Sequence, residues 1–346
     1  MNIHLLDPLS DHRWDELVAR HPRGSAFHQR GWLESLSRTY GYKPLVVTST
    51  SAEEPLNDGI VLCCVSSWIT GTRLVSLPFA DHCDPLLNDA GESLGFVDWL
   101  KSECDCRGWK YVELRPRLGT EDLQHQMPGN ASYYFHSLDL APALGQIFQS
   151  FHRDSIQRRV RRAEKEGLEY EAGRSDQLID EFYRLLVMTR RRHHVLPQPR
   201  AWFQNLVVCM GEKTQIRLVR KSGKAIAAML NLRHRSSVVY KYGCSDERVH
   251  HLGGMPLLFW RLIEESKATG ADEVDFGRSD MDNPGLVTFK DRFGTTKKLL
   301  TYFRYPQTQK RVGAPRWDLR AMRQVVAVLP NAILPAAGGL LYRHMG

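Results

Sequence analysis

The chain has 346 residues, of which 42% are hydrophobic and 25% are charged. This composition is typical of a folded globular protein and excludes a disordered or collagen-like chain. The length exceeds that of one ordinary domain, so we expect two. No apolar stretch reaches the ~20 residues that cross a membrane, and the N-terminus lacks the basic head of a secretory signal. We therefore expect a cytoplasmic protein without a transmembrane segment.

Charge is distributed unevenly along the chain. Residues 1–145 hold 12 Lys and Arg against 19 Asp and Glu, whereas residues 146–346 hold 35 against 20. The basic C-terminal half should attract an anionic partner, such as nucleotide phosphates, nucleic acid or a membrane surface. A single basic cluster usually belongs to a solvated helix face. Three clusters in one domain, at 153–162, 190–194 and 290–298, favour a binding surface.

The seven cysteines are odd in number and no regular spacing links them. Such a pattern indicates a reducing compartment rather than a disulfide framework. No two pairs of cysteines stand at the spacing of zinc ligands, so we expect no metal site.

Strands and helices alternate over the first 140 residues. Apolar spacing predicts helical segments within 18–40 and over 95–107. Runs rich in β-branched residues and bounded by turn formers predict strands at 44–49, 59–67, 72–77, 111–114 and 133–138.

The second half follows a similar rhythm. Long helices are predicted at 141–167 and 176–194, after which Pro197 and Pro199 break the chain. The remaining elements are predicted as strands at 214–220, 224–234 and 237–243, a helix at 255–269, a strand at 273–276, a helix at 286–293 and a strand at 298–305. We expect an α/β (α+β) fold with domains at 1–145 and 146–305 and a tail at 306–346.

A glycine pair precedes the clearest helix of the chain. Gly253 and Gly254 follow a strand and a loop that contains Arg248. Glycines allow a ligand to approach the backbone closely, and the free N–H groups of a helix N-terminus favour an anion. These three residues are candidates for binding an anionic group of a substrate. Taken alone, a glycine pair before a helix more often forms a simple turn.

Three motifs follow one another around this helix: YKYGCSD at 240–246, DFGRS at 275–279 and GLVTFKDRFG at 285–294. Their order resembles the FemAB-like branch of the GNAT acyltransferase superfamily, and the similarity covers about 25–305. The length and the arginine-rich segment 151–167 look most like the FemAB-related proteins associated with exosortase/PEP-CTERM and exopolysaccharide loci.

The resemblance implies two tandem GNAT-like domains, each a mixed, mostly antiparallel sheet flanked by helices. It implies an N-acyltransferase or aminoacyltransferase without a tightly bound cofactor. The donor would be acyl-CoA or aminoacyl-tRNA, and the acceptor an amine of a peptidoglycan, exopolysaccharide or other cell-envelope precursor. The alternative from another class is a non-catalytic nucleic-acid-binding protein that uses the same basic clusters.

Roles for residues near the reacting groups follow from the same resemblance. Lys290 matches the lysine of the family's F-K motif, whose cation would stabilise developing charge, and Phe289 would line the donor site. We expect Lys290 to reach into a wet cleft, where its replacement leaves stability almost unchanged. Asp275 is a candidate base or a partner of Arg278, and Arg278 is an anion-binding candidate or a structural ion pair.

Acceptor-binding candidates come from both halves. Asp81 and Asp84 belong to a polar insertion that resembles the family's acceptor-facing loop, although a turn stabilised by aspartate side chains is at least as plausible. Tyr242, in the first of the three motifs, is the third candidate.

The tail combines a basic segment at 316–323 with an apolar segment at 325–341 that prolines and glycines interrupt. It is too short and too broken to span a bilayer. We expect it to pack back on the first domain, with a peripheral contact to the inner face of the membrane as the alternative.

Overall fold

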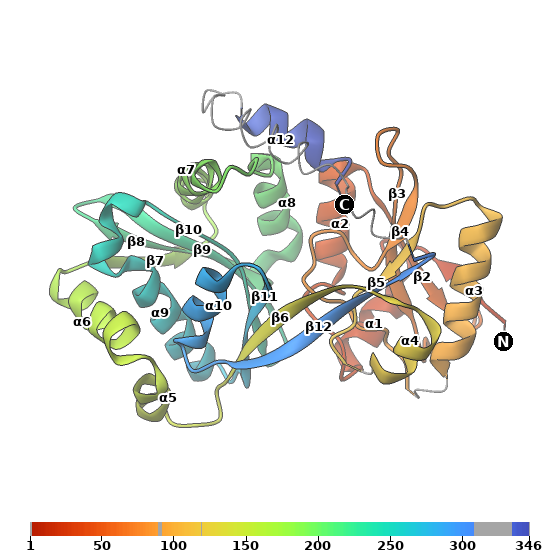
Figure 1. The fold of residues 1–346 in the computed structure, drawn as a ribbon, viewed down its shortest axis with the longest axis horizontal. Coiled ribbons are helices and arrows are strands. Elements are labelled where there is room, and N and C mark those ends of the chain that lie inside the picture. Colours follow the sequence, from red (N-terminus) through yellow and green to blue (C-terminus); the bar gives the residue numbers. More distant parts are fainter. Residues whose placement is uncertain (1, 89–91, 119, 308–333, 346) are drawn as a thin grey trace. The chain divides into compact units, whose positions relative to one another are not determined.

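The computed structural model describes residues 2–88, 92–118, 120–307 and 334–345. Their contacts divide the chain into two compact units (Figure 1). Among the described residues, unit 1 holds 2–133, 299–307 and 339–345, and unit 2 holds 134–298 and 334–338. The division falls earlier than the boundary expected at 145, because strand β6 (Gly129–Asp139) carries the chain across without a linker.

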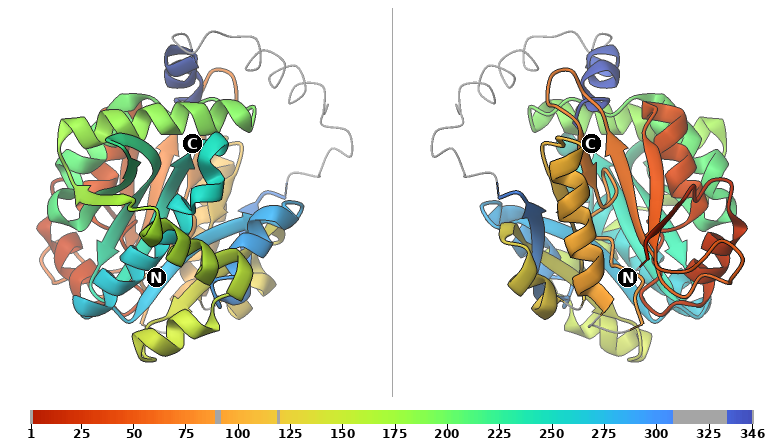
Figure 2. Two further views of the ribbon diagram at one scale, coloured as in Figure 1. Left: turned by 90° about the vertical axis from the view of Figure 1, so that its left-hand side faces the viewer. Right: turned by 90° about the vertical axis from the view of Figure 1, so that its right-hand side faces the viewer.

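Unit 1 is built on a sheet with the strand order β1-β2-β3-β4-β5-β12. Neighbouring strands are antiparallel except β4 and β5, which are parallel. Helices α1 and α2 lie on the opposite side of these strands from α3 (Figure 2). The elements are β1 (His4–Leu6), α1 (His12–Arg20), α2 (Arg30–Tyr40), β2 (Lys43–Thr48), β3 (Ile60–Val65), β4 (Arg73–Val75), α3 (Glu92–Cys106), β5 (Val112–Leu114), α4 (Thr120–Gln126) and β12 (Thr296–Tyr305).

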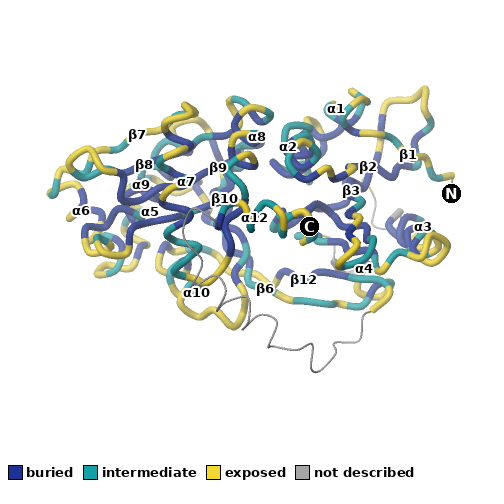
Figure 3. Tube along the Cα trace, turned by 90° about the horizontal axis from the view of Figure 1, so that it is seen from above, coloured by how far each residue is buried: buried dark blue, intermediate teal, exposed yellow. Residues whose placement is uncertain are grey.

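Unit 2 is built on strands in the order β6-β11-β10-β9-β8-β7. Strands β8, β9 and β10 are mostly buried (Figure 3), because helices cover both of their faces. The elements after β6 are α5 (Leu144–Ser150), one π-helical turn η1 (Arg153–Gln157), α6 (Arg158–Lys165), β7 (Glu169–Gly173), α7 (Asp176–Arg192), α8 (Arg200–Met210), η2 (Gly211–Lys213), β8 (Thr214–Lys221), β9 (Lys224–His234), β10 (Ser237–Ser245), η3 (Glu247–Leu252), α9 (Gly254–Ala268), β11 (Glu273–Asp280) and α10 (Pro284–Asp291).

The two units repeat one arrangement. In each, antiparallel strands lead to a parallel pair that a helix connects: β4 and β5 through α3, and β10 and β11 through α9. The strand that completes each sheet is distant in sequence from its neighbour, since β12 lies beside β5 and β6 beside β11. The predicted fold class, two tandem units with mixed and mostly antiparallel sheets flanked by helices, is confirmed.

Two segments differ from the prediction. The single helix expected over 141–167 is broken into α5, η1 and α6, because the chain becomes extended at Phe151 and His152. A whole helix, α8, follows the prolines that were expected only to break the chain. Pro199 is its N-cap, a place where a fixed φ does no harm, and Trp202, Phe203 and Leu206 bury the inner face.

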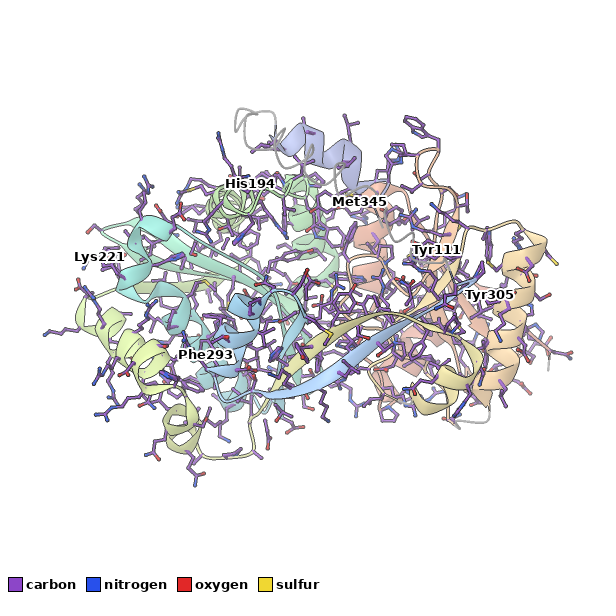
Figure 4. The ribbon with its side chains drawn as sticks, viewed as in Figure 1. Tyr111, His194, Lys221, Phe293, Tyr305 and Met345 are labelled. Carbon is purple, nitrogen blue, oxygen red and sulfur yellow. The ribbon has the colours of Figure 1, made fainter. Side chains whose placement is uncertain are left out.

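An aromatic cluster forms the core of unit 2 under the N-terminal half of α9. Phe259 stacks on Phe276 with ring centroids 4.8 Å apart, and Phe293 lies 4.8 Å from Phe259. Phe293, labelled in Figure 4, follows the end of α10 and also packs on Phe276 with ring centroids 5.5 Å apart. Each buried ring contributes on the order of 2–3 kcal/mol, so α9, α10 and β11 are held together as one support.

The C-terminal residues of the described chain contact unit 1. The Tyr42 hydroxyl donates to the backbone oxygen of Tyr342, which ends helix α12 (Leu334–Tyr342), at 2.8 Å. The basic segment 316–323 and most of the apolar segment 325–341, for which a membrane contact was the alternative, lie outside the described residues. Within the part of the chain that is described, no helix is both long and apolar enough to cross a bilayer.

Candidate functional site

Strands β10 and β11 separate partway along their length. They pair in parallel only from Ser237–Val239 to Glu273–Asp275, although β10 runs on to Ser245 and β11 to Asp280. Beyond the pairing, a cavity of about 320 Å³ lies along β10. Its walls come from β10, from the N-terminus of α9, and from α7, α6 and α10. Such a cavity, open where two parallel strands part, is a common ligand site in sheets of this kind.

A β-bulge decides which tyrosine of β10 faces this cavity. Tyr240 pairs with Asn231 and Tyr242 with Leu230, so Lys241 is an extra residue and the alternation of faces is reset. Tyr240 packs on Phe259 of α9 and lines the cavity. Tyr242 lies on the other face, where its hydroxyl accepts a hydrogen bond from Trp202 at 2.9 Å.

The N-terminus of α9 forms one end of the cavity. Gly253 has a φ of +82°, and a Cβ on it would collide with the backbone oxygen of Arg159, so only glycine fits. Gly254 lines the cavity, and a Cβ there would lie 3.0 Å from that of Ala227. In the described chain, the N–H groups of Gly254 and Met255 have no backbone acceptor outside the helix. They are therefore available to an anion.

Positive charge surrounds this helix N-terminus. Three arginines line the cavity, Arg159 from α6, Arg192 from α7 and Arg292 from the end of α10. Arg192 is partly engaged by Glu247, at 3.8 Å. Within the described residues, the guanidinium groups of Arg159 and Arg292 form no hydrogen bond or ion pair. Two free guanidinium groups beside free backbone N–H groups match the needs of a phosphate.

Two neutral groups complete the wall. Burial, helped by the charge of Arg192, lowers the pKa of His250, whose Nε2 lies 2.7 Å from the Ser245 hydroxyl oxygen. Burial raises the pKa of Tyr240, so this hydroxyl keeps its proton at neutral pH. The Tyr240 hydroxyl forms no hydrogen bond within the described chain. The cavity thus offers a proton donor and a neutral imidazole next to its cations.

The loop arginine predicted to bind the donor lies outside the cavity wall. Arg248 is exposed and pairs with Asp246, with Nη2 and Oδ2 2.6 Å apart. The Arg248 guanidinium holds the pKa of Asp246 at about 2. Asp246 rather than Arg248 lines the cavity. The positive charge of the cavity wall comes instead from Arg159, Arg192 and Arg292. In the sequence these residues stood out only as members of basic clusters.

Lys290 and Asp275 both act on one backbone residue, Gly277. Lys290 Nζ donates to the oxygens of Gly277 and Arg278 at 3.0 and 2.8 Å, and Asp275 Oδ1 accepts from the Gly277 N–H at 2.6 Å. Lys290 is only 3% exposed. The expectation of a lysine in a wet cleft is therefore wrong: α10 turns this side chain inward, under the end of β11.

Of the two residues next to the Lys290 side chain or its contacts, Phe289 lines the cavity and Arg278 does not. Phe289 lines the cavity and packs at the edge of the Phe259 cluster. Arg278 lies on β11 directly after Gly277 and is not part of the cavity wall.

The aspartates of unit 1 have structural contacts. Asp84 is buried, and its Oδ1 accepts from the N–H groups of Arg117 and Leu118 at 2.6 and 2.8 Å. The backbone oxygen of Asp81 accepts from the Tyr302 hydroxyl at 2.6 Å. These contacts tie Asp84 to a distant segment of unit 1 and do not form the local aspartate turn that was weighed against an acceptor site.

The family comparison bears directly on unit 2. Residues 150–291, which include most of the cavity wall, match the acetyltransferase (GNAT) domain. Unit 2 is thus similar to a GNAT domain, and this match supports an acyltransferase, as the motifs predict. No protein of curated function matches the sequence.

Solved structures share the fold of the whole chain. FemX aligns with 88% of this chain and 97% of its own at a TM-score of 0.69 and 14% identity. The C-terminal domain of a putative lysylphosphatidylglycerol synthetase from Agrobacterium fabrum aligns over 94% and 97%, at 0.57 and 16%. A tandem GNAT protein from the clavulanic acid biosynthesis pathway aligns over 89% and 100%, at 0.52 and 11%. At these identities the likeness is one of fold, and it fits the FemAB-like branch.

Proposed function

We propose that the GNAT domain of unit 2 transfers an acyl or aminoacyl group from a phosphate-bearing donor to an amine. The donor is acyl-CoA or aminoacyl-tRNA, both of which place phosphate near an activated carbonyl. The observation that carries the proposal is the cavity beside β10, where two free arginines meet the N-terminus of α9. A phosphate there would lie on Arg159, Arg292 and the N–H groups of Gly254 and Met255.

The chemistry needs no covalent intermediate on the protein. The amine nitrogen attacks the carbonyl carbon, and the bond to the sulfur or oxygen of the donor breaks. Tyr240 is the candidate to protonate that leaving atom, since this residue lines the cavity and its hydroxyl keeps its proton. Neutral His250 on the same wall is a candidate to accept the proton that the amine loses.

We still propose that Lys290 and Asp275 take part in the reaction. Their contacts indicate that both act through the backbone of Gly277. Both hold Gly277 at the end of β11, where this strand has left β10. A buried ammonium on two carbonyl oxygens fixes that backbone and adds positive charge beneath the cavity floor. We also retain Arg248, Arg278 and Gly253 as proposed donor residues, and Asp81, Asp84 and Tyr242 as proposed acceptor residues.

The acceptor we propose is an amine of a cell-envelope precursor, with peptidoglycan first because the fold is that of FemX. The exopolysaccharide acceptor rests on the motif resemblance alone. A cytoplasmic protein that reaches the inner face of the membrane suits either precursor.

Gly254 offers a direct test of the donor site. Gly254→Asp places a carboxylate where the phosphate is proposed to bind, so donor affinity should fall well over tenfold. Gly254→Ala is the matched control, because it adds the same Cβ against Ala227 without charge. Titration calorimetry with CoA, and separately with a non-hydrolysable aminoacyl-tRNA, identifies the donor. Equal binding by the two variants, or no binding of either donor by the wild type, would contradict the proposal.

A further inference from the structure

The loop between β3 and β4 presents two apolar side chains to solvent. Trp68 is 88% exposed and Ile69 is 53% exposed. Figure 1 shows this loop extending beyond the ends of the two strands. Exposed apolar residues are ordinary when they stand singly, but a tryptophan with an isoleucine beside it at a projecting tip is not.

The tip is held in shape, so the exposure of Trp68 is built into the turn. The Gly71 N–H donates to the Ser67 backbone oxygen at 2.8 Å and closes the loop. The Ser67 hydroxyl oxygen accepts from the N–H groups of Ile69 and Thr70 at 3.2 and 3.0 Å. These bonds point the side chains at 68 and 69 outward.

The C-terminal segment of unit 1 joins this tip. The His344 ring lies edge-on to Trp68 with centroids 5.9 Å apart, and its Nδ1 is 3.0 Å from the Ser67 hydroxyl oxygen. The Thr70 hydroxyl donates to the His344 backbone oxygen at 3.0 Å. Met345, the next residue, is 54% exposed and extends the apolar surface.

A cationic cavity of about 410 Å³ lies directly beside the tip. Its described lining contains Lys110, Arg73 and Arg304 but no carboxylate. Lys110 is exposed, and its Nζ donates to the Thr70 backbone oxygen at 3.1 Å, which leaves its charge unneutralised. Tyr111 and Met345, both labelled in Figure 4, belong to the same wall.

Arg304 and Arg73 fix the shape of that cavity. Arg304 stacks on Tyr111, 3.9 Å from the ring centroid, and pairs with Glu113. Arg73 donates to the Thr70 hydroxyl oxygen at 2.7 Å and to the His344 backbone oxygen at 2.9 Å. The cations are therefore tied to the tip and to the C-terminal segment, and cavity and apolar surface form one rigid feature.

We propose that this feature docks unit 1 on an anionic phospholipid bilayer. Trp68, Ile69 and Met345 would enter the interfacial layer, where tryptophan is favoured, and the cavity with Lys110 would receive a lipid phosphate. The charge decides between partners: an apolar tip beside cations, with no carboxylate in the described wall, is complementary to an anionic surface. The proposal concerns unit 1 and stands apart from the donor site of unit 2.

Vesicle sedimentation of the full chain tests the docking. Wild-type protein should sediment with phosphatidylcholine vesicles that contain phosphatidylglycerol and much less with pure phosphatidylcholine. The double variant Trp68→Ser, Ile69→Ser should bind about tenfold more weakly. Lys110→Glu should lower binding by about tenfold or more, and added salt should reduce that difference.

Two variants elsewhere control for general changes in polarity and charge. Val208→Ser removes an exposed apolar side chain from α8, and Lys213→Glu reverses an exposed charge in unit 2. Both should bind vesicles like the wild type. Inorganic phosphate should not release the protein from the vesicles.

Three results would overturn the proposal. They are absence of wild-type binding to phosphatidylglycerol vesicles, equal binding by the tip variant and Val208→Ser, and phosphate binding that depends on Lys110 without any vesicle binding. The last result would mark the cavity as a site for a soluble phosphate compound.

Discussion

Burial gives Lys290 a structural role in addition to the chemical role that its motif suggests. An ammonium group on two backbone oxygens is part of the folded structure as well as of the proposed chemistry. Replacing it leaves two buried acceptors unpaired, at a cost of about 1–3 kcal/mol each where water cannot enter. Rate and stability must therefore be measured separately.

We predict that Lys290→Met lowers both quantities. Loss of a positive charge near the developing oxyanion should reduce the single-turnover rate about a hundredfold or more. The free energy of unfolding should fall by a few kcal/mol, as followed by denaturant titration. Lys290→Arg should restore neither fully, because a planar guanidinium cannot occupy the same point.

Lys298→Met is the matched control, since the ammonium group of this exposed lysine on β12 forms no hydrogen bond or ion pair in the described chain. It should leave rate and stability unchanged. A folded Lys290→Met variant with wild-type turnover would show that Lys290 is structural only.

The residue types of the site could be predicted more readily than their orientation. The sequence singled out Gly254 and Phe289 as donor-site candidates, and both line the cavity. The motifs could not show that a bulge at Lys241 turns Tyr240 toward the cavity and Tyr242 away from it, because a one-residue insertion leaves no local signal in the sequence. Arg159 and Arg292 were hidden within basic clusters for a similar reason: only the packing of α6 and α10 distinguishes them from their neighbours.

The arginines of helix α6 fall into two groups, one that lines the cavity and one that does not. Val160 and Ala163 face the core. All four arginines of α6 are exposed, but only Arg159 lines the cavity, whereas Arg158, Arg161 and Arg162 do not. A polynucleotide donor would extend beyond the cavity, whereas we expect the phosphates of CoA to bind within it. Binding of the two donors should therefore depend differently on Arg158, Arg161 and Arg162.

We predict that replacing Arg158, Arg161 and Arg162 by glutamine leaves CoA affinity within about twofold. If aminoacyl-tRNA is the donor, its binding should weaken, and the slope of log K against log salt should decrease by about one for each arginine. Filter binding over a salt series measures both effects. Equal weakening for CoA and tRNA would contradict this division of α6.

At the level of elements, the sequence predicted strands better than helix boundaries. The strands β8, β9 and β10 fall where β-branched runs and turn residues place them. The helices α5 and α6 were merged because both are amphipathic and the break at Phe151 lacks proline or glycine. Helix α8 was missed because two prolines precede it, although a proline before the first turn is compatible with a helix.

The stability of the whole molecule should depend on pH through buried histidines in both units. Burial lowers the pKa of His21 and of His136 below the usual value of 6.5. The unfolded chain then binds more protons than the folded chain as the pH falls through 6.5, so acidification favours unfolding.

We predict that the melting temperature falls between pH 7 and pH 5. His136→Asn should lessen this dependence, because the imidazole that must be protonated in the unfolded chain is gone. Thermal melts in buffers of constant ionic strength measure the effect. A melting temperature that is constant or rises on acidification would contradict the prediction.

Across the molecule, the two repeated units differ in what they can bind. The charge arithmetic indicated this division, with the positive excess after residue 145, but only the structure shows where the charge converges. In unit 2 it surrounds the N-terminus of α9, in the segment that matches the GNAT domain. The central claim is that this cavity holds the phosphates of the acyl donor.

The most direct measurement of that claim is donor affinity for the double variant Arg159→Gln, Arg292→Gln. Each lost charge-assisted contact is worth about 1.5–3 kcal/mol, so affinity for whichever donor the wild type binds should fall at least about a hundredfold. Arg158→Gln, on the same helix but outside the cavity wall, should change affinity less than about threefold. Wild-type affinity in the double variant would contradict the account and place the donor elsewhere.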